Sequence, residues 1–427
     1  MDIYPRSFYD SDGDGVGDIK GITEKSDYLV DLGVEMIWLN PVLKSPMKDF
    51  GYDISDFRAI DPIFGTMEDY ENMLKEMHSK NIKVIFDFVP NHTSDQHEWF
   101  IKSVQNDPKY KDYYVWKDPK GYNSTGAPIP PNNWVSIFRF SAWEWSEERK
   151  QFYLHKFLKE QPDLNYRNPE VVKEMNDVIR FWLDKGVDGF RVDAIQNLVE
   201  DVSFADEPPA ANSGITDPTL EGYYNHIYTL NQPETIDVIR GWHEVLESYK
   251  DRFMTLEVYD EDVKEIMKFY GNETNPVSDF PFNFFFINKL SGMVDAVISF
   301  EDTQDPAGIN MGPAHYRETS RDPERNPMQW MTLKMQFGTI EFAVATEEVL
   351  AFVRSYEGSP TYLVVINTSP EETTIDVQNG DVKLPDSATV VIRSITDTRE
   401  ETNVGSTVNL SSVSLQGGEG LVLLVEE

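Results

Sequence analysis

The chain has 427 residues, which predicts about two to three domains, and its 38 Lys and Arg against 74 Asp and Glu leave a formal net charge of −36. With no basic stretch to offset that charge, it is poorly matched to nucleic-acid backbones or anionic lipid. The absence of cysteine excludes disulfides, thiol nucleophiles and Cys-ligated metals. No signal peptide is recognisable at residues 1–6, and the apolar run 421–425 is too short to span a bilayer.

Apolar runs and helical patterns alternate through the first 330 residues. We expect strands at 36–39, 83–89, 187–193 and 253–258, and helices at 67–80, 169–184 and 235–250. Repeated strand–helix–strand units predict a parallel sheet, and more than five of them would indicate a (β/α)8 barrel. Residues 94–165 interrupt the alternation and are rich in Pro, Trp and Asn, so they are predicted to form an inserted subdomain.

The sequence changes character from about residue 333, where it becomes rich in Val, Thr and Ser with Gly, Asn and Asp at turns. Short strands are expected at 349–353, 361–366, 389–392 and 421–425. Together they predict a small antiparallel β domain at the C-terminal end.

Ionisable residues stand where three predicted strands end: Asp87 with His92, Arg191 with Asp193, and Glu257. Each alone could be a helix cap or half of a buried ion pair, but three successive strands delivering Asp, Asp and Glu to one rim favour a catalytic site. Two facing carboxylates are what glycoside hydrolysis needs, about 5 Å apart in retaining enzymes. Arg191 lies on the same strand face as Asp193 and could hold that carboxylate ionised.

Several strings in this chain resemble an α-glucosidase (maltase) of the α-amylase superfamily of glycoside hydrolases, most similar to the insect maltases. The matching strings are residues 3–8, 49–54, 87–92, 161–165, 189–194, 255–259 and 320–330, in order along nearly the whole chain. The resemblance implies a TIM barrel with a subdomain after the third strand and a C-terminal β-sandwich. The implied segments are 1–93 and 166–332 for the barrel, 94–165 for the subdomain and 333–427 for the β domain.

The resemblance implies a retaining exo-α-glucosidase that releases terminal α-1,4-linked glucose from maltose, sucrose or short malto-oligosaccharides, with Asp193 as nucleophile and Glu257 as general acid/base. Asp87 would support Arg191. Ala194 directly follows the implied nucleophile, and in this position it resembles enzymes that prefer α-1,4 to α-1,6 bonds. Such enzymes are secreted or face the cell exterior. The residues implied to grip the glucose are Tyr52, Asp53, His92, Arg191 and Arg325, with Asp53 and Arg325 closing the pocket as an ion pair.

The loop 10–18 carries oxygen donors at alternating positions and matches the front of an EF-hand loop, although Gly21 stands where the closing Glu should be. It can be an acidic, solvated loop. The resemblance instead implies a structural Ca²⁺ or Mg²⁺ site, with no cofactor in catalysis, formed by Asp10, Asp12, Asp14, the Val16 carbonyl and Asp18.

Five Asn-x-Ser/Thr sequons are present, and they matter only if the chain reaches the secretory route. Asn91 lies within the string 87–92 and is expected to be buried. The sequons begin at Asn91, Asn123, Asn272, Asn367 and Asn409.

One feature of the family is missing from this sequence. The family carries a third acid in an Asn-His-Asp string at the end of strand seven, yet after Glu257 the only histidine is His315, followed by Tyr316. The 73 positions from Glu257 to Trp330 are too few for strands six to eight at about 30 residues per unit. We expect strand seven to be lost between 284 and 292, a second gap after Trp330, and a start within strand one, as in an incomplete gene model or a splice form.

A barrel without these strands would have unpaired edges, and the lost acid would remove contacts that strengthen in the transition state. We therefore predict that the chain is weakly active or inactive. The alternatives are a non-catalytic receptor or binding protein on the same scaffold, or a transporter heavy chain. The heavy chains carry a membrane anchor, whereas we expect no transmembrane helix in these residues, and retention of Asp193 and Glu257 argues against long loss of catalysis.

Overall fold

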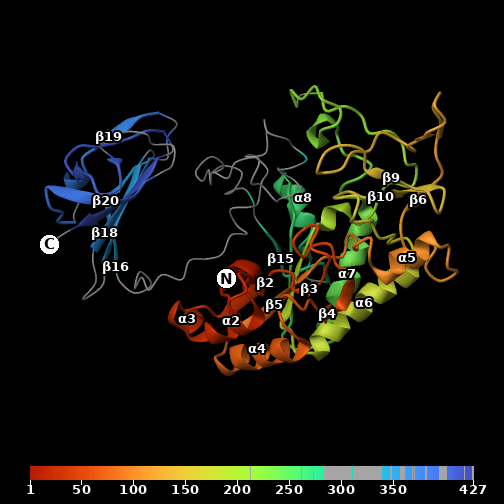
Figure 1. Ribbon diagram of the computed structural model, residues 1–427, viewed down its shortest axis with the longest axis horizontal. Helices are drawn as coiled ribbons and strands as arrows, with labels where there is room; N and C mark the ends of the chain where they lie inside the picture. Colours follow the sequence, from red (N-terminus) through yellow and green to blue (C-terminus); the bar gives the residue numbers. More distant parts are fainter. Residues whose placement is uncertain are drawn as a thin grey trace. The chain divides into compact units, whose positions relative to one another are not determined.

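The computed structural model describes residues 1–282 apart from 212, 261 and 273, residues 284 and 310, and residues 339–425 with short gaps. The gaps in the last range are 347–348, 356–360, 368, 370, 380–381, 394–401 and 418. Two compact units share the chain, one containing residues 1–285 and the other residues 329–427. Figure 1 shows both, and each is described by itself.

Six parallel strands form the central sheet of the first unit, adjacent in the order in which they occur along the chain. This order confirms the predicted parallel sheet, and it is the strand order of a barrel rather than of a doubly wound sheet. The strands are β1 (Asp2–Ile3), β2 (Met36–Leu39), β5 (Lys83–Phe88), β11 (Gly189–Val192), β12 (Phe253–Leu256) and β15 (Phe280–Pro281).

The longer helices follow the strands as predicted, and α6 lies alongside α7 (Figure 1). Helix α7 begins earlier than the predicted residue 235, because Pro233 suits the first helical position. The helices are α1 (Pro5–Phe8), α2 (Ile19–Glu24), α3 (Ser26–Asp31), α4 (Met67–Ser79), α5 (Glu98–Val104), α6 (Pro169–Asp184), α7 (Pro233–Glu247) and α8 (Val263–Lys268), with 3₁₀ turns η1 (Ile195–Asn197) and η2 (Glu221–Tyr223).

Aromatic packing joins the helices to the sheet. The ring of Trp182 on α6 stacks on Phe86 of β5 with centroids 4.7 Å apart, and Tyr70 of α4 meets the same indole edge-on at 5.3 Å. The indole Nε1 donates to the Phe57 carbonyl at 2.8 Å, so this buried donor is satisfied. The helices are thus fixed on strand β5, whose end carries a predicted site residue.

The segment 94–165 forms small antiparallel sheets of its own, packed around Trp134, Trp143 and Phe152. The strands are β6 (Trp116–Lys117), β9 (Trp143–Ser146), β10 (Gln151–Leu154) and the hairpin β7 (Gly121–Tyr122) and β8 (Pro128–Ile129). Two further hairpins lie outside this segment: β3 (Leu43–Lys44) with β4 (Asp56–Ile60), and β13 (Gly271–Asn272) with β14 (Asn275–Pro276). An insertion with its own core can place its loops over the barrel strands without interrupting them.

The second unit contains a six-stranded antiparallel sheet and a two-stranded one, as the β-rich composition predicted. Alternating residues of the strands, such as Leu363, Val365, Leu421 and Leu423, form its buried core. The strands are β16 (Thr339–Ala345), β17 (Val349–Ser355), β18 (Thr361–Asn367), β19 (Thr373–Ile375), β20 (Ser387–Arg393), β21 (Thr407–Asn409), β22 (Val413–Leu415) and β23 (Gly420–Val425), with the turn η6 (Val377–Asn379).

Strands β11 and β12 approach closely at Gly189, where a Cβ would lie 2.0 Å from the Phe253 carbonyl oxygen. Gly189→Ala should therefore lower the free energy of unfolding by about 1–3 kcal/mol through overpacking. Gly241→Ala in α7 is the matched control, because its Cβ would meet nothing within 4 Å and Ala favours a helix by about 1 kcal/mol. Urea unfolding should be monitored by circular dichroism. We expect the Gly189→Ala midpoint to lie below the midpoint of the unmodified chain and the Gly241→Ala midpoint to lie above it. A Gly189→Ala midpoint at or above it would contradict the close approach.

Candidate active site

The guanidinium of Arg191 is the centre of the carboxylate cluster. Its Nη1 donates to Asp87 Oδ1 at 2.9 Å and to Asp193 Oδ1 at 2.6 Å, and its Nη2 lies 2.8 Å from Glu257 Oε1. Strand register explains the arrangement, since Arg191 pairs with Asp87 across β5 and β11. Three strand ends therefore deliver their acids to one buried cation, as the sequence predicted.

Neighbouring strands hold Arg191 and Asp87 in place. The Arg191 guanidinium lies 4.7 Å from the ring centroid of Trp38 on β2, within range of a cation–π interaction. The Tyr52 hydroxyl lies 3.2 Å from Asp87 Oδ2 and 2.8 Å from Asn40 Oδ1. The sequence indicated Tyr52, Asp87 and Arg191 but not Trp38 or Asn40, whose only signal is their place at the end of an apolar run.

One cation cannot neutralise three buried carboxylates, so their pKa values depart from the ordinary ones. Burial raises the pKa of Asp87 to about 6 and raises the pKa of Asp193 well above its usual range, in both cases against the effect of Arg191. Burial acts in the same direction on Glu257, but Arg191 and hydrogen bonds from Asp193, Ala194 and Tyr259 outweigh it and hold its pKa below the ordinary value. Asp193 and Glu257 are hydrogen-bonded to each other, which raises the pKa of Asp193 and lowers the pKa of Glu257.

The backbone turns sharply after Asp193. Ala194 adopts φ 51° and ψ 30°, a left-handed conformation that is uncommon for a residue with a Cβ. In this conformation its N–H donates to Glu257 Oε2 at 3.2 Å. Such local strain persists only where surrounding structure enforces it, and it is concentrated at functional sites.

His92 lies at the cluster's edge, held by the inserted segment. Its Nε2 is 3.0 Å from Gln161 Nε2 and 3.2 Å from the Tyr52 carbonyl oxygen. Burial lowers the pKa of His92 to about 4, so the imidazole is neutral near pH 7. The Gln161 amide also donates to Asp49 Oδ2 at 3.1 Å, which brings a further buried carboxylate to this edge.

A second buried charge cluster lies behind His92. Asp163 accepts from the Asn91 amide at 3.0 Å and from the Lys156 backbone N–H at 3.2 Å, while the Lys156 ammonium is buried among Glu221, Asp163, Glu200 and Glu207. These contacts join the loop after β5 to the inserted segment. They fix the backbone that carries His92, although the sequence offered no signal for Lys156.

Of the two remaining predicted sugar-binding residues, the structure describes only Asp53. Asp53 is fully buried and accepts hydrogen bonds from Ser45 Oγ and from the backbone N–H groups of Lys48 and Asp49, each at 2.9 Å. These bonds direct its carboxylate into its own loop, whereas Asp49 contacts Gln161 beside His92. Arg325 lies outside the described residues.

The acidic loop before α2 brings Asp10, Asp12 and Asp18 together, each offering an oxygen within 4.8 Å of the others. Backbone N–H groups of Gly15 and Gly13 donate to Asp10 and lower its pKa, which keeps it ionised. Asp14 is outside this group, and its Oδ1 accepts from the Val16 N–H at 2.8 Å. Three carboxylate oxygen donors fit a hard divalent cation.

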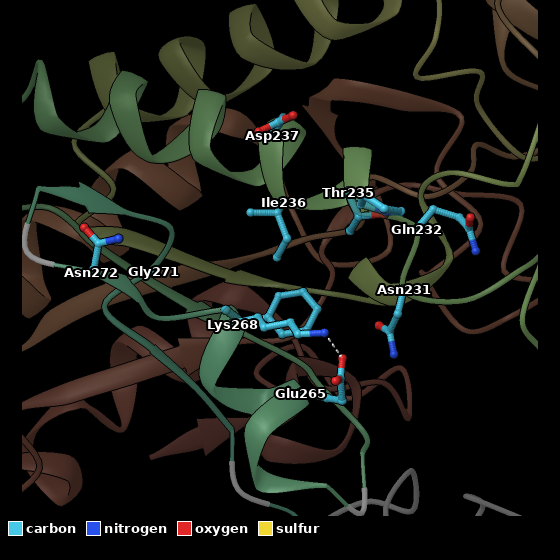
Figure 2. A pocket seen from close by; sticks show the side chains of 11 residues that line it. Asn231, Gln232, Thr235, Ile236, Asp237, Glu265, Lys268, Gly271 and Asn272 are labelled. Atoms are coloured by element: carbon cyan, nitrogen blue, oxygen red, sulfur yellow. Dashed lines mark hydrogen bonds and ion pairs between the residues drawn. The ribbon is translucent and has the colours of Figure 1, made fainter.

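The structure also has a hollow of about 450 Å³ that the clustered carboxylates do not line (Figure 2). Asn231 lies at one end and Asn272 at the other, and Lys268 pairs with Glu265 on its wall. None of the clustered acids lines it, so the hollow is separate from the carboxylate cluster.

The geometry can be compared with known proteins. The α-amylase catalytic-domain model matches residues 2–291. This chain belongs to the α-amylase family. It is 37% identical to Maltase 1 of Drosophila virilis over 99% of this chain and 85% of the relative, and 41% identical to a salivary α-glucosidase of Aedes aegypti over 77% and 69%.

The crystal structure of the α-glucosyl transfer enzyme XgtA has a TM-score of 0.67 and 29% identity, covering 100% of this chain and 98% of that one. These likenesses establish a (β/α)8-barrel architecture with a C-terminal β domain. They make this α-amylase family member a maltase-like α-glucosidase, a glycoside hydrolase. The described residues contain no helix both long and apolar enough to cross a membrane.

Removing the central cation tests the electrostatics of the cluster. Arg191→Met should lower the free energy of unfolding by about 3–5 kcal/mol at pH 8, where the orphaned acids are ionised or forced to hold protons. The loss should be smaller at pH 5, because an acid with a raised folded-state pKa destabilises the fold as pH rises above its unfolded value. Arg180→Met removes a half-exposed arginine paired with Asp177 on α6 and should change stability by less than about 1 kcal/mol. Equal effects in the two variants, or no pH dependence for Arg191→Met, would contradict this account.

Proposed function

We propose that this chain uses Asp193 as nucleophile and Glu257 as general acid/base in retaining hydrolysis of terminal α-1,4-linked glucose. The observation that carries the proposal is the single buried guanidinium that contacts both carboxylates at the ends of adjacent parallel strands. Double displacement needs two such groups, one attacking the anomeric carbon and one protonating the leaving oxygen.

The reaction requires a proton on the acid/base and none on the nucleophile. Attack needs Asp193 ionised and Glu257 protonated, whereas burial raises the pKa of Asp193 and the Arg191 guanidinium helps to lower the pKa of Glu257. We propose that a bound sugar, by separating the two groups, leaves the proton on Glu257. Arg191 then stays paired with the nucleophile, and Asp87 keeps the guanidinium oriented.

The pocket for the non-reducing-end glucose follows from the neighbouring polar groups. Neutral His92 and the Tyr52 hydroxyl can hydrogen-bond sugar hydroxyls without adding charge. We propose that Asp49 takes the sugar-binding place expected of Asp53, because its contact with Gln161 directs it toward His92. The predicted Arg325 partner would then close the pocket against Asp49, and Asp53 would hold the loop in shape.

We propose further that part of the family's barrel, including strand seven with the third acid, is absent from this chain. The alignment with Maltase 1 extends over 546 positions, so at least 119 of them have no residue in this 427-residue chain. The α-amylase model stops matching at residue 291, beside the predicted join between 284 and 292. Loss of the acid removes contacts that strengthen in the transition state, so we expect little or no turnover.

Release of glucose from maltose or a nitrophenyl α-glucoside tests both parts of this proposal. The chain as it stands should turn over at least about 100-fold more slowly than a form carrying a relative's strand-seven segment between residues 284 and 292, a factor equivalent to about 3 kcal/mol. Asp193→Asn in the restored form should abolish turnover while circular dichroism stays unchanged. Equal rates for the two chains would contradict the proposed loss, and an active Asp193→Asn variant would contradict the assigned nucleophile.

We propose that Asp10, Asp12 and Asp18 hold a structural Ca²⁺ or Mg²⁺ ion, with Asp14 shaping the loop rather than binding. The close approach of three carboxylate groups supports this arrangement. The ion would offset their mutual repulsion and order the chain before α2, whose N-cap is Asp18. No step of the reaction depends on it.

Calcium should raise the melting temperature of the chain, and at about 100 times its Kd it should add about 3 kcal/mol to the free energy of unfolding. Asp12→Asn should weaken this stabilisation, because it removes one ligand charge. Asp14→Asn in the same loop should retain most of it. If Asp14→Asn reduces the stabilisation by calcium more than Asp12→Asn does, Asp14 is a ligand, as the sequence resemblance implies, and the proposed arrangement is wrong.

The salivary relative supports a secreted protein. We propose that this chain acts outside the cell, on small α-glucosides that are dissolved there.

A further inference from the structure

Burial divides the five sequons of this chain into two classes. Asn91 and Asn367 are almost fully buried, whereas Asn123, Asn272 and Asn409 are exposed. A glycan is a bulky polar group that must remain in solvent, so only an exposed asparagine can carry one in a folded protein.

Hydrogen bonds fix the two buried amides. The Asn367 amide nitrogen donates to the carbonyl oxygens of Glu371 at 2.8 Å, Gln416 at 3.0 Å and Leu415 at 3.3 Å. The Asn91 amide nitrogen donates to Asp163 Oδ1 at 3.0 Å, inside the cluster behind His92. Attaching a sugar to either nitrogen would break these bonds and displace packed backbone.

The exposed three share one geometry. In each, the asparagine Oδ1 accepts from both the backbone N–H and the hydroxyl of the Ser or Thr two positions on, at 2.9 and 2.7 Å for Asn123, 3.1 and 2.8 Å for Asn272, and 3.0 and 2.8 Å for Asn409. Within the described residues, no protein group accepts a hydrogen bond from these three amide nitrogens. The carbonyl oxygen is thus turned inward, and the nitrogen is left for solvent.

Each site also lies where a large substituent fits. Asn123 follows β7 in the β7–β8 hairpin loop, Asn409 ends the strand β21, and Asn272 lies in the β13–β14 hairpin at one end of the hollow in Figure 2. None of them touches the catalytic carboxylates. Modification there would leave the active site unobstructed.

We propose that Asn123, Asn272 and Asn409 carry N-linked glycans and that Asn91 and Asn367 do not. In the transfer, a bond forms between the asparagine Nδ2 and C1 of the first N-acetylglucosamine of a lipid-diphosphate-linked oligosaccharide. The bond from C1 to the diphosphate oxygen breaks, and one amide proton leaves as the diphosphate departs. The proposal rests on the secretory route and not on turnover.

The test is glycopeptide mapping of the chain secreted from insect cells behind a heterologous leader. Folded, monodisperse protein is treated with N-glycosidase F in H₂¹⁸O, which converts each occupied asparagine into ¹⁸O-labelled aspartate that mass spectrometry locates. Label is expected at Asn123, Asn272 and Asn409. Thr125→Ala, Thr274→Ala and Ser411→Ala should each remove one labelled site, and Thr93→Ala should remove none.

The same mapping is done on the form with the restored strand-seven segment, so that poor folding of the present chain does not decide the result. Label at Asn91 or Asn367 in folded protein, or its absence from any of the three exposed sites, would overturn the proposal. Loss of glucose release with the expected labelling pattern would instead count against the proposed catalytic function alone.

Discussion

The buried guanidinium of Arg191 is the interaction on which the candidate site depends. It contacts Asp87, Asp193 and Glu257, and these four residues come from three adjacent parallel strands. A cation buried without partners would be strongly unfavourable, and so would three buried carboxylates without a cation. Strand register, burial and the pKa values of the three acids therefore depend on one another.

The supporting structure follows from the same requirement. Trp38 covers the guanidinium, and Trp182 of α6 stacks on Phe86 of the strand that carries Asp87. The inserted segment contributes Gln161 and Asp163, which hold His92 and its backbone at the edge of the cluster. A maltase-like site thus uses the sheet to place its charged groups and the insertion to hold neutral His92 beside them.

Strand ends could be predicted from sequence because a short continuous apolar run marks where a buried strand lies, and the period of two along a strand defines which way its residues point. This is why Asp87, Arg191, Asp193 and Glu257 were placed at one rim. The loop 43–56 has no such period, so the sequence could not tell which of Asp49 and Asp53 turns toward His92. Burial of Lys156 and of the Asn367 sequon is likewise set by contacts distant in the chain, which a single sequence does not reveal.

Asp193 as the reacting group is the central claim, and covalent trapping tests it most directly. The restored chain would be incubated with a fluorinated α-glucosyl fluoride, which forms a covalent glycosyl–enzyme that is hydrolysed only slowly. The labelled peptide would then be sequenced by mass spectrometry. The account predicts one glucosyl group on Asp193 and none in the Asp193→Asn variant. Label on Glu257 or Asp87, or turnover without any covalent intermediate, would contradict it.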